Sequence, residues 1–464
     1  MKEFITELFK GKHVAIFGFG KEGRSSYRFL RSCLPGHPIF ILDSNTHLQD
    51  DPEIANDPGL ELITGEDFSA VITEFDYILK APGVPGSAFP ERMDHKRITS
   101  QTDLFLRYYR KQVIGVTGTK GKSTTASLIS HILTRSGYHT ILLGNIGLPP
   151  FEGIPEITPE TRIVMELSSH QLEYLTRSPH IAVLLNIFQE HLDHYTSYVE
   201  YQHAKMNIGR YQDMDDYFIY SADNKLLSEL VQRETGFGQN LFPYTLNTPG
   251  ENRIYRIGNS IRIIDQLTEY ELVTPAVVNH LPGEHNFSNI MAAAAACHFT
   301  GASPAQIGDA VGSFKGLEHR IEYVGEFEGV RYYNDSIATI PEAAIEAVKT
   351  LKEVDTLILG GFDRGIDYSI LYPFLEGSGI SNVIFVGEAG KRMRRELGNS
   401  TKHGMKLFNA DNFREVVMIA RQETKRGRIC LLSPAASSYD MFMNFEHRGN
   451  IFKKNVREIS PSHE

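Results

Sequence analysis

The sequence lacks three features that would place it in a special class of protein. Cys33, Cys297 and Cys430 are its only cysteines and are far apart, so neither a disulfide framework nor a cysteine metal site is expected. No apolar run is long enough to cross a membrane, and the charged N-terminus does not resemble a signal peptide. A net charge of −10 argues against a nucleic-acid partner. We therefore expect a monomeric cytoplasmic protein without nucleic-acid or membrane partners.

Tryptophan is also absent, but the chain has ample material for folded cores. It contains 27 phenylalanines and 21 tyrosines, and 41% of its residues are hydrophobic. A length of 464 residues corresponds to about three domains. Segments typical of buried strands alternate with helical segments, which favours an α/β fold. We predict a Rossmann-like domain at 1–107, a phosphate-loop domain with a parallel sheet at 108–315, and a second Rossmann-like domain with a parallel sheet at 316–464.

The clearest motif lies between a buried strand at 113–117 and a helix that begins near Ser123. Its glycines allow backbone N–H groups to surround an anion, with the positive end of the helix dipole behind them. Lys122 supplies a charge for the outer phosphates, and Ser123 an oxygen for Mg²⁺. An ordinary strand–helix connection is the alternative. The motif predicts a nucleotide triphosphate site formed by Gly118, Thr119, Lys120, Gly121, Lys122, Ser123 and Thr124.

A second glycine-rich turn follows the strand at 13–17 and precedes a helix predicted from about Arg24. Its Gly18, Gly20 and Gly23 match G-x-G-x-x-G, and Asp43 ends the next strand twenty residues after Gly23. This arrangement is typical of dinucleotide binding, with the aspartate at a ribose hydroxyl. Alone it would suggest an NAD enzyme, but any nucleotide diphosphate can use the same helix terminus. The turn at 81–85 follows another strand at the edge where ligands bind, unless it is a plain loop.

Polar side chains follow three strands of the central region. Asn145 comes after the strand at 140–143, Glu166 after the strand at 162–165, and His191 after the strand at 181–186. A carboxylate at the end of a strand beside a phosphate loop is expected to contact Mg²⁺. An exposed Glu166 and a surface His191 are the alternatives.

Two further sites of interest lie on a predicted helix or directly before one. Lys205 falls in a helix predicted at 198–211, and its position alone favours a charge that reaches solvent. Asn286 and Asn289 precede a helix predicted at 290–299 and lie one turn apart. They can face one side and hydrogen-bond an adenine edge, or they merely cap that helix.

The last region again places polar residues at strand ends. We expect them to line a cleft at the carboxyl edge of its sheet. These residues are Arg320, Asp335, Thr339, Arg364 and Ser438.

Together these motifs resemble those of the Mur ligases, the ATP-dependent enzymes that add amino acids to peptidoglycan precursors. The resemblance covers essentially the whole chain, and the glutamate-adding members of the family are the most similar. It rests on the phosphate loop and on residues 166–172, 190–193, 283–286, 319–320, 334–336, 432–435 and 444–449.

The resemblance implies that the substrates are UDP-N-acetylmuramoyl-L-alanine, glutamate and ATP, with Mg²⁺ as cofactor. It assigns catalysis to Lys122, Glu166, His191 and Lys205, and Mg²⁺ ions to Ser123, Glu166, His191 and Lys205. The family carbamylates the matching lysine, which converts a cation into an oxygen ligand. The UDP-linked substrate would contact Gly18, Gly20, Lys21, Glu22, Gly23, Asp43, Gly83, Asn145, Ser168 and Gln171.

The same resemblance assigns the remaining contacts. ATP would be bound by the phosphate loop and by Asn286, Asn289, Arg320 and Asp335, with the last domain closing on it. Glutamate would be bound by Thr339, Arg364, Ser438 and Phe445. The alanine carboxylate would take the γ-phosphoryl group of ATP, and the glutamate amine would attack the acyl phosphate through a tetrahedral intermediate.

The chain departs from the usual pattern of the D-glutamate enzymes at three positions. Ile337 replaces a lysine, Ile340 an asparagine, and Arg364 a further lysine. The turn at 18–24 also resembles a smaller branch of the family that adds L-glutamate. D-glutamate is the expectation from the family, and L-glutamate is the alternative.

Two rival functions stay open, of which the first is another ligase of the same superfamily and the second belongs to a different class of protein. A folylpolyglutamate-type ligase would not require the first glycine-rich domain. A nucleotide-binding regulator would bind ATP without the turnover that depends on an amino acid.

Overall fold

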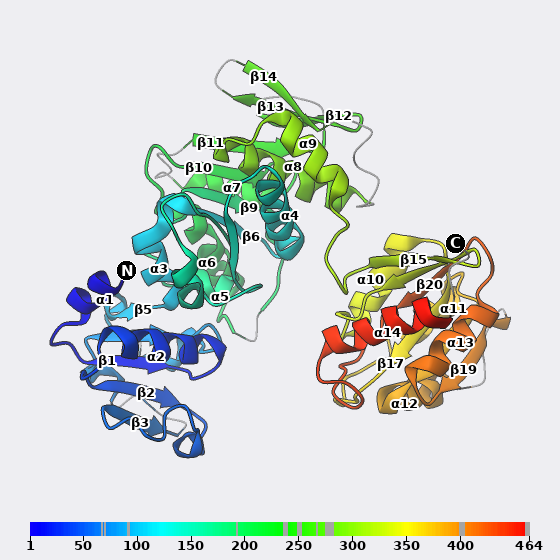
Figure 1. The fold of residues 1–464 in the computed structure, drawn as a ribbon, viewed down its shortest axis with the longest axis horizontal. Helices are drawn as coiled ribbons and strands as arrows, with labels where there is room; N and C mark the ends of the chain where they lie inside the picture. Colours follow the sequence, from blue (N-terminus) through cyan, green and yellow to red (C-terminus); the bar gives the residue numbers. More distant parts are fainter. Residues whose placement is uncertain are drawn as a thin grey trace. The chain divides into compact units, whose positions relative to one another are not determined.

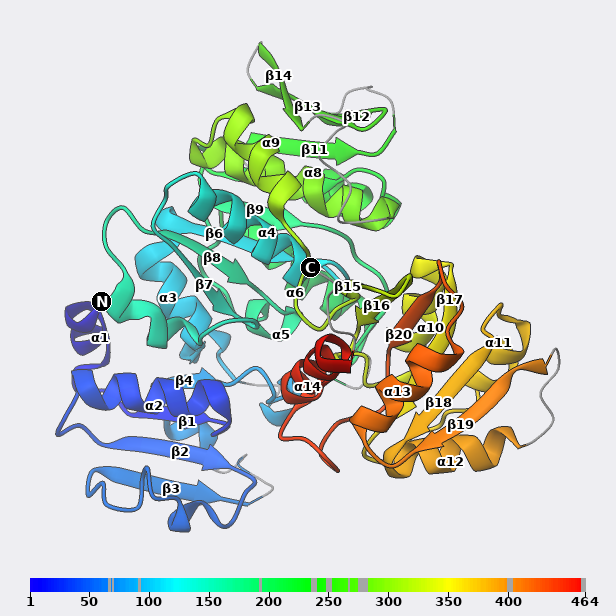
Figure 2. The same cartoon turned by 45° about the vertical axis from the view of Figure 1, so that its right-hand side comes forward.

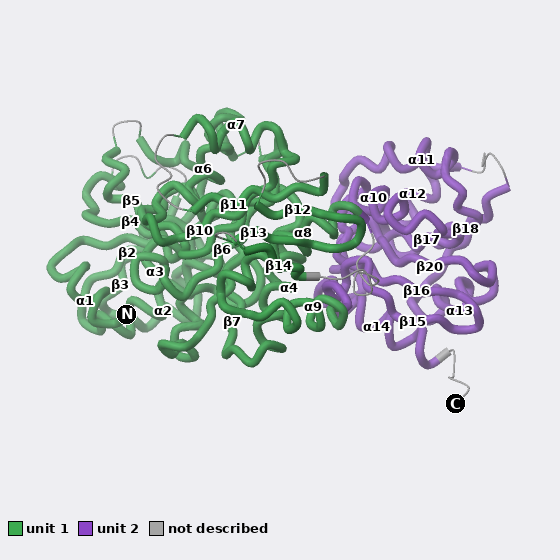
Figure 3. Tube along the Cα trace, turned by 90° about the horizontal axis from the view of Figure 1, so that it is seen from above, with its two compact units in different colours: residues 1–279, 284–314 green, residues 280–283, 315–464 purple. Residues whose placement is uncertain are grey.

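The computed structural model describes the chain except residues 66–67, 69–70, 91–92, 192–193, 235–239, 248–252, 266–267, 274–282, 399–403 and 460–464. Its strands form three sheets, of five, nine and six strands (Figure 1). The chain divides into two compact units (Figure 3). The first contains Met1–Asn279 and Glu284–Phe314, and the second contains His280–Gly283 and Lys315–Glu464.

The first sheet is parallel throughout, as predicted, with the strand order β3-β2-β1-β4-β5. Its central strand β1 is fully buried, which requires cover on both faces. Helix α2 begins at Lys21, earlier than predicted, because the helix starts inside the glycine-rich turn. The elements are α1 (Lys2–Phe9), β1 (Val14–Phe17), α2 (Lys21–Cys33), β2 (Ile39–Asp43), β3 (Leu60–Thr64), β4 (Tyr77–Lys80), β5 (Ile98–Thr99) and α3 (Gln101–Tyr109).

The central sheet has the order β14-β13-β12-β11-β10-β9-β6-β8-β7. The strands from β11 to β7 run parallel, and the buried strands β6, β8 and β9 form the middle of this part. Its strands are β6 (Val113–Thr117), β7 (Thr140–Gly144), β8 (Arg162–Glu166), β9 (Ile181–Leu184), β10 (Tyr217–Ser221), β11 (Asn240–Thr245), β12 (Ile254–Ile257), β13 (Ser260–Asp265) and β14 (Thr268–Val273).

The sequence analysis did not predict the edge strands β12, β13 and β14, of which β13 pairs antiparallel with both neighbours. Helix α8 begins at Glu284 rather than near residue 290, so Asn286 and Asn289 lie inside it and do not cap it. The helices are α4 (Lys122–Arg135), α5 (Ser169–Leu172), α6 (Tyr198–Arg210), α7 (Lys225–Arg233), α8 (Glu284–Thr300) and α9 (Pro304–Ser313).

The third sheet has the order β15-β16-β20-β17-β18-β19 (Figure 2). The expectation of a wholly parallel sheet is wrong for β15, because the tight turn at Gly329 forces an antiparallel hairpin with β16. The strands are β15 (Glu322–Phe327), β16 (Val330–Asn334), β17 (Val354–Gly360), β18 (Asn382–Val386), β19 (Lys406–Ala410) and β20 (Ile429–Leu432). The helices are α10 (Pro341–Leu351), α11 (Leu371–Gly377), α12 (Gly387–Leu397), α13 (Phe413–Glu423) and α14 (Phe445–Ile459).

No helix in the described part of the chain is long and apolar enough to span a lipid bilayer.

Candidate active site

The phosphate loop lies between β6 and α4, at the carboxyl edge of the central sheet. Gly121 has a φ of 89°, which favours glycine. A Cβ atom at this position would lie 2.4 Å from Oδ1 of Asn289, so α8 packs directly on the loop. The structure thus brings buried Asn289 to the predicted triphosphate site, from a segment far away in the sequence.

Two residues that the sequence analysis did not single out hold this loop. Asn186 accepts a hydrogen bond from the Lys120 N–H at 2.8 Å, and its amide donates to the Lys120 carbonyl at 3.0 Å. The Tyr201 hydroxyl lies 2.8 Å from Oγ1 of Thr119. The position of Asn186 just beyond β9 was an available signal, since polar residues at carboxyl ends of parallel strands meet at one edge.

The two lysines of the predicted catalytic set converge on one backbone carbonyl. Lys122 donates to the carbonyls of Gly118 and Thr119, at 3.0 and 3.1 Å. Lys205 donates to the Gly118 carbonyl at 2.9 Å and is 1% exposed, so the expectation of a solvent-exposed charge is wrong. Burial, together with the charge of Lys122, holds the pKa of Lys205 well below its usual value.

Glu166 presents a buried carboxylate beside this loop. Oε1 accepts a hydrogen bond from the Asn145 amide at 2.8 Å, whereas Oε2 is buried and has no hydrogen-bond partner among the described residues. The alternative of an exposed Glu166 is therefore wrong, since the residue is 1% exposed. Burial of a negative charge without a partner is costly unless a cation neutralises it. Carboxylate oxygens are the ligands that Mg²⁺ prefers.

His191 lies in the segment that follows β9, of which residues 192–193 are outside the described part. It adopts a φ of 59°, a left-handed conformation that is uncommon for residues other than glycine, although histidine adopts it more often than most. Its side chain is 43% exposed, in accord with the surface alternative, and lies 3.8 Å from Glu190. Glu190 in turn pairs with Lys120 of the phosphate loop at 2.6 Å.

Ser123 is half-buried on the first turn of α4. The oxygens of Ser123 and of Glu166, whose Oε2 has no hydrogen-bond partner among the described residues, are of the kind that Mg²⁺ prefers, and joint ligation with His191 stays a prediction.

A cavity of about 530 Å³ opens at the carboxyl edge of the first sheet. Three of the residues predicted to bind the UDP-linked substrate line it together, namely Gly18, Asp43 and Gly83. Asp43 accepts a hydrogen bond from the Phe19 N–H at 2.6 Å and so holds the glycine-rich turn. Gly23 serves close packing, since a Cβ atom there would lie 2.0 Å from the Gly18 carbonyl oxygen. The remaining lining residues are Phe17, Ser44, Phe68, Val84, Pro85, Ser87, Ala88, Phe89 and Pro90.

Other residues assigned to the UDP-linked substrate connect the first sheet to the central sheet. Ser168 and Gln171 form a capping box at the start of α5, and the Gln171 amide donates to Glu22 at 2.5 Å. Burial raises the pKa of Glu22 to about 7. Lys21 donates to the Gly147 carbonyl at 3.3 Å. Contact of these residues, and of Gly20, with a ligand stays a prediction.

In the second unit, Asp335 is buried at the end of β16. It accepts hydrogen bonds from the Ser433 hydroxyl at 2.7 Å and from the Ile321 N–H at 3.1 Å. Burial raises its pKa to about 7. Arg320 is exposed.

The predicted glutamate-binding residues lie near the same strand ends. The Arg364 guanidinium donates to the Thr339 carbonyl at 3.1 Å, so these two residues are brought together. Ser438 is buried, and the carbonyl of Phe445 accepts a hydrogen bond from Ser336 at 2.8 Å. Binding of glutamate by these residues stays a prediction.

Arg448 belongs to the motif at 444–449 but was assigned no role, and it is fully buried on α14. Its guanidinium donates to the carbonyls of Ser336, Ala436 and Ser437 at 2.8 to 3.0 Å. It therefore holds together the segments that follow β16 and β20.

Comparison with known proteins agrees with this geometry. The family described as the Mur ligase middle domain matches residues 116–297. The UDP-N-acetylmuramoylalanine–D-glutamate ligase of Ruminiclostridium cellulolyticum is 32% identical, over 99% of this chain and 99% of that protein. The same-named protein of Geotalea daltonii is 33% identical, over 97% and 98%.

The fold is shared with a solved member of the group. The MurF ligase of Thermotoga maritima, in complex with ADP, has a TM-score of 0.54 at 15% identity, covering 99% of this chain and 100% of that chain. The chain belongs to the Mur ligases, the ATP-dependent ligases that join an amino acid to an acid. The relatives that match nearly its full length include the two D-glutamate ligases above.

Proposed function

We propose that this chain is a glutamate-adding Mur ligase of the cytoplasm, which joins glutamate to UDP-N-acetylmuramoyl-L-alanine at the expense of ATP. The names of relatives that match nearly the full chain support the substrates. One structural observation carries the chemistry: the orphaned carboxylate oxygen of Glu166 and the buried amine of Lys205 flank a single phosphate loop. The ATP contacts of Asn286, Arg320 and Asp335, and the monomeric state, belong to this proposal.

The chain's own residues would act by binding, positioning and excluding water. Lys122 would exchange its hydrogen bonds to the loop carbonyls for hydrogen bonds to the γ-phosphate of ATP. A charged phosphate oxygen forms a stronger hydrogen bond with an ammonium group than a neutral carbonyl does. The phosphate loop and Asn289 would hold the nucleotide in line with the alanine carboxylate. Positioning and charge neutralisation supply most of the rate enhancement in phosphoryl transfer.

Lys205 is suited to carbamylation because its amine is buried and its pKa is lowered. The neutral amine would attack CO₂, form an N–C bond and release one proton, which yields a carbamate anion. With that carbamate, Ser123, Glu166 and His191 would hold Mg²⁺, which neutralises developing negative charge when bound.

The identity of the acceptor follows from the relatives, and one observation favours a second candidate. Ile337 stands where the D-glutamate enzymes usually have a lysine, so one cation near a dicarboxylate acceptor is missing. Ile340 beside it is 45% exposed. This departure weakens the case for the usual acceptor geometry, and L-glutamate is the second candidate because the turn at 18–24 resembles the branch of the family that adds it.

We expect phosphate release from ATP and Mg²⁺ to require both UDP-N-acetylmuramoyl-L-alanine and glutamate. Initial rates with D-glutamate, L-glutamate and no amino acid test this, with omission of the UDP-linked substrate as the control. Release with D-glutamate alone supports the D-glutamate assignment, and release with L-glutamate alone selects the second candidate. Equal rates with and without amino acid would show that the proposal is wrong.

A further inference from the structure

A row of buried charged and aromatic side chains lies between the first sheet and the segment that carries His191. Lys80, the last residue of β4, places its ammonium 2.7 Å from Oε2 of Glu173. The other carboxylate oxygen of Glu173 lies 2.6 Å from Nε2 of His194. The Lys80 side chain is 2% exposed, and those of Glu173 and His194 are each 9% exposed. One carboxylate thus joins two segments that are separated by more than a hundred residues of sequence.

The contacts of His194 lead directly to His191. The backbone N–H of His194 donates to the His191 carbonyl at 3.1 Å. The ring of His170 lies between the two histidines, with its centroid 3.9 Å from that of His194 and 5.0 Å from that of His191. A fixed His194 therefore restrains both the backbone and the ring surroundings of His191.

The conformation of His191 explains why it needs such restraint. Its left-handed φ of 59° is unfavourable for a residue other than glycine and persists only where the surroundings over-determine it. The carboxylate of Glu173 supplies a charged hydrogen bond and a buried ion pair for this purpose.

We propose that Glu173 is a positioning residue that fixes the His191 segment against the first sheet and thereby sets the affinity of the enzyme for its divalent cation. The inference rests on the proposed role of His191 as a metal ligand. Partners that orient a metal ligand typically change metal affinity by 10–100-fold when they are removed. Lys80 directly precedes the turn at 81–85, of which residues 83–85 line the cavity of the first sheet. Through its ion pair with Lys80, Glu173 therefore also connects that cavity with the proposed metal site.

The experiment measures binding of Mn²⁺ to the full chain by electron paramagnetic resonance, with a non-hydrolysable ATP analogue present. We expect Glu173→Gln to weaken Mn²⁺ binding by about tenfold or more. His194→Phe keeps a ring against His170 but loses the bond to Glu173, and we expect a loss in the same direction. Glu200→Gln is the matched control, because this carboxylate holds Thr196 in the same segment on the exposed side.

A double variant separates positioning from stability. Glu173→Gln alone leaves the buried ammonium of Lys80 without its ion-pair partner and should lower the melting temperature of the first unit, which contains both residues. Lys80→Met combined with Glu173→Gln removes both charges, so we expect stability to recover while Mn²⁺ binding stays weak. Recovery of Mn²⁺ binding together with stability, or wild-type binding in Glu173→Gln, would overturn the inference. Absence of Mn²⁺ binding in the wild-type chain would overturn the proposed metal site itself.

Discussion

Replacement of Glu166 by glutamine is expected to lower the kcat of glutamate-dependent phosphate release by about a thousandfold. A metal ion that neutralises transition-state charge contributes several kcal/mol, and each 1.36 kcal/mol corresponds to a factor of about ten in rate. Glutamine keeps an acceptor for the Asn145 amide but removes the negative charge beside the phosphate loop. The loss should therefore appear in turnover and in the concentration of Mg²⁺ required.

Stability should respond differently from activity in this variant. The buried Oε2 atom has no hydrogen-bond partner among the described residues, and a buried anion of this kind destabilises the folded state. We expect the free energy of unfolding of Glu166→Gln to stay within about 1 kcal/mol of the wild type or to rise. Steady-state kinetics test the expected loss of kcat, and thermal unfolding tests the expected stability. Glu160→Gln, in the exposed turn before β8, is the control. A kcat within threefold of the wild type would contradict the assignment of Glu166.

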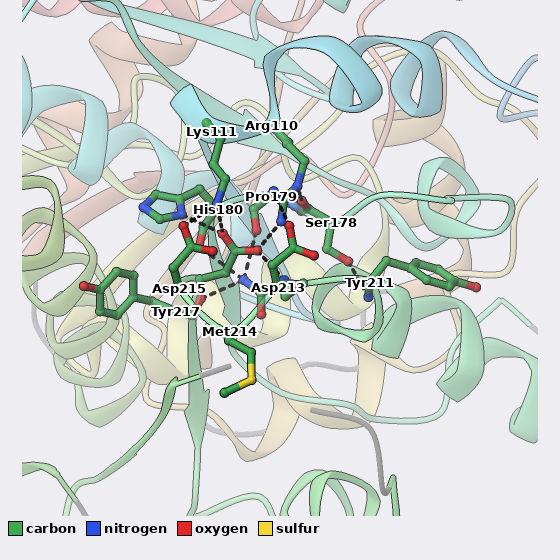
Figure 4. A network of polar contacts seen from close by, with 12 residues as sticks. Arg110, Lys111, Ser178, Pro179, His180, Tyr211, Asp213, Met214, Asp215 and Tyr217 are labelled. Atoms are coloured by element: carbon green, nitrogen blue, oxygen red, sulfur yellow. Dashed lines mark hydrogen bonds and ion pairs between the residues drawn. The ribbon is translucent and has the colours of Figure 1, made fainter. Parts of the chain in front are cut away.

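Replacement of Asp216 by asparagine is expected to destabilise the fold by about 3–5 kcal/mol, because it breaks a buried ion-pair network. The Asp216 carboxylate is fully buried and contacts the guanidinium of Arg110, Lys111 at 3.0 Å and His180 at 2.7 Å. Figure 4 shows these basic residues pointing toward the 213–217 segment. Removal of the carboxylate would leave the Arg110 guanidinium, which is 10% exposed, with only the exposed Asp213 as its ion-pair partner. Asp215→Asn is the matched control, since that side chain is 71% exposed and should change stability by less than about 0.5 kcal/mol.

The effect of Asp216 should also depend on pH with a defined sign. Burial alone would raise the pKa of Asp216, but hydrogen bonds from His180, the Asp213 N–H and Lys111, with the charge of Arg110, hold it below the usual value. A lowered pKa means that the stabilisation is present above the unfolded-state pKa of about 4 and is lost as the pH falls through the folded-state pKa. Urea unfolding at several pH values should show the wild type and Asp216→Asn converging in acid. A constant difference down to pH 2 would contradict this account.

Local sequence patterns were sufficient for most elements that surround the candidate site. The phosphate loop, the strand before it and the α/β class follow from glycine spacing and buried strand runs, and the structure confirms them. Glu166 was placed correctly because a polar residue after an apolar strand must emerge at the carboxyl edge of the sheet.

Other features depended on contacts that sequence spacing does not encode. Burial of Lys205 and the approach of Asn289 to Gly121 result from packing between distant helices and the loop, so local patterns favoured exposure or capping. The strands β12–β14 are a different case, because β13 does carry a signal: Ile261 and Ile263 are buried and flank the half-exposed Arg262. Asn186 and Arg448 act through hydrogen bonds to backbone groups, and Tyr201 acts through one to the Thr119 hydroxyl, so these roles become visible only from tertiary contacts.

The distribution of the hydrophobic side chains has a consequence for cooperativity. In the described part of the chain, one continuous cluster contains side chains of both the first and the central sheet, such as Ile16 and Met165. The clusters around the third sheet draw only on the second unit. Heating should therefore melt the first two sheets as a single cooperative block, whereas residues 315–464 form a separate one. A single melting temperature does not describe such a molecule, and a ligand held by one block alone would raise one transition and leave the other in place.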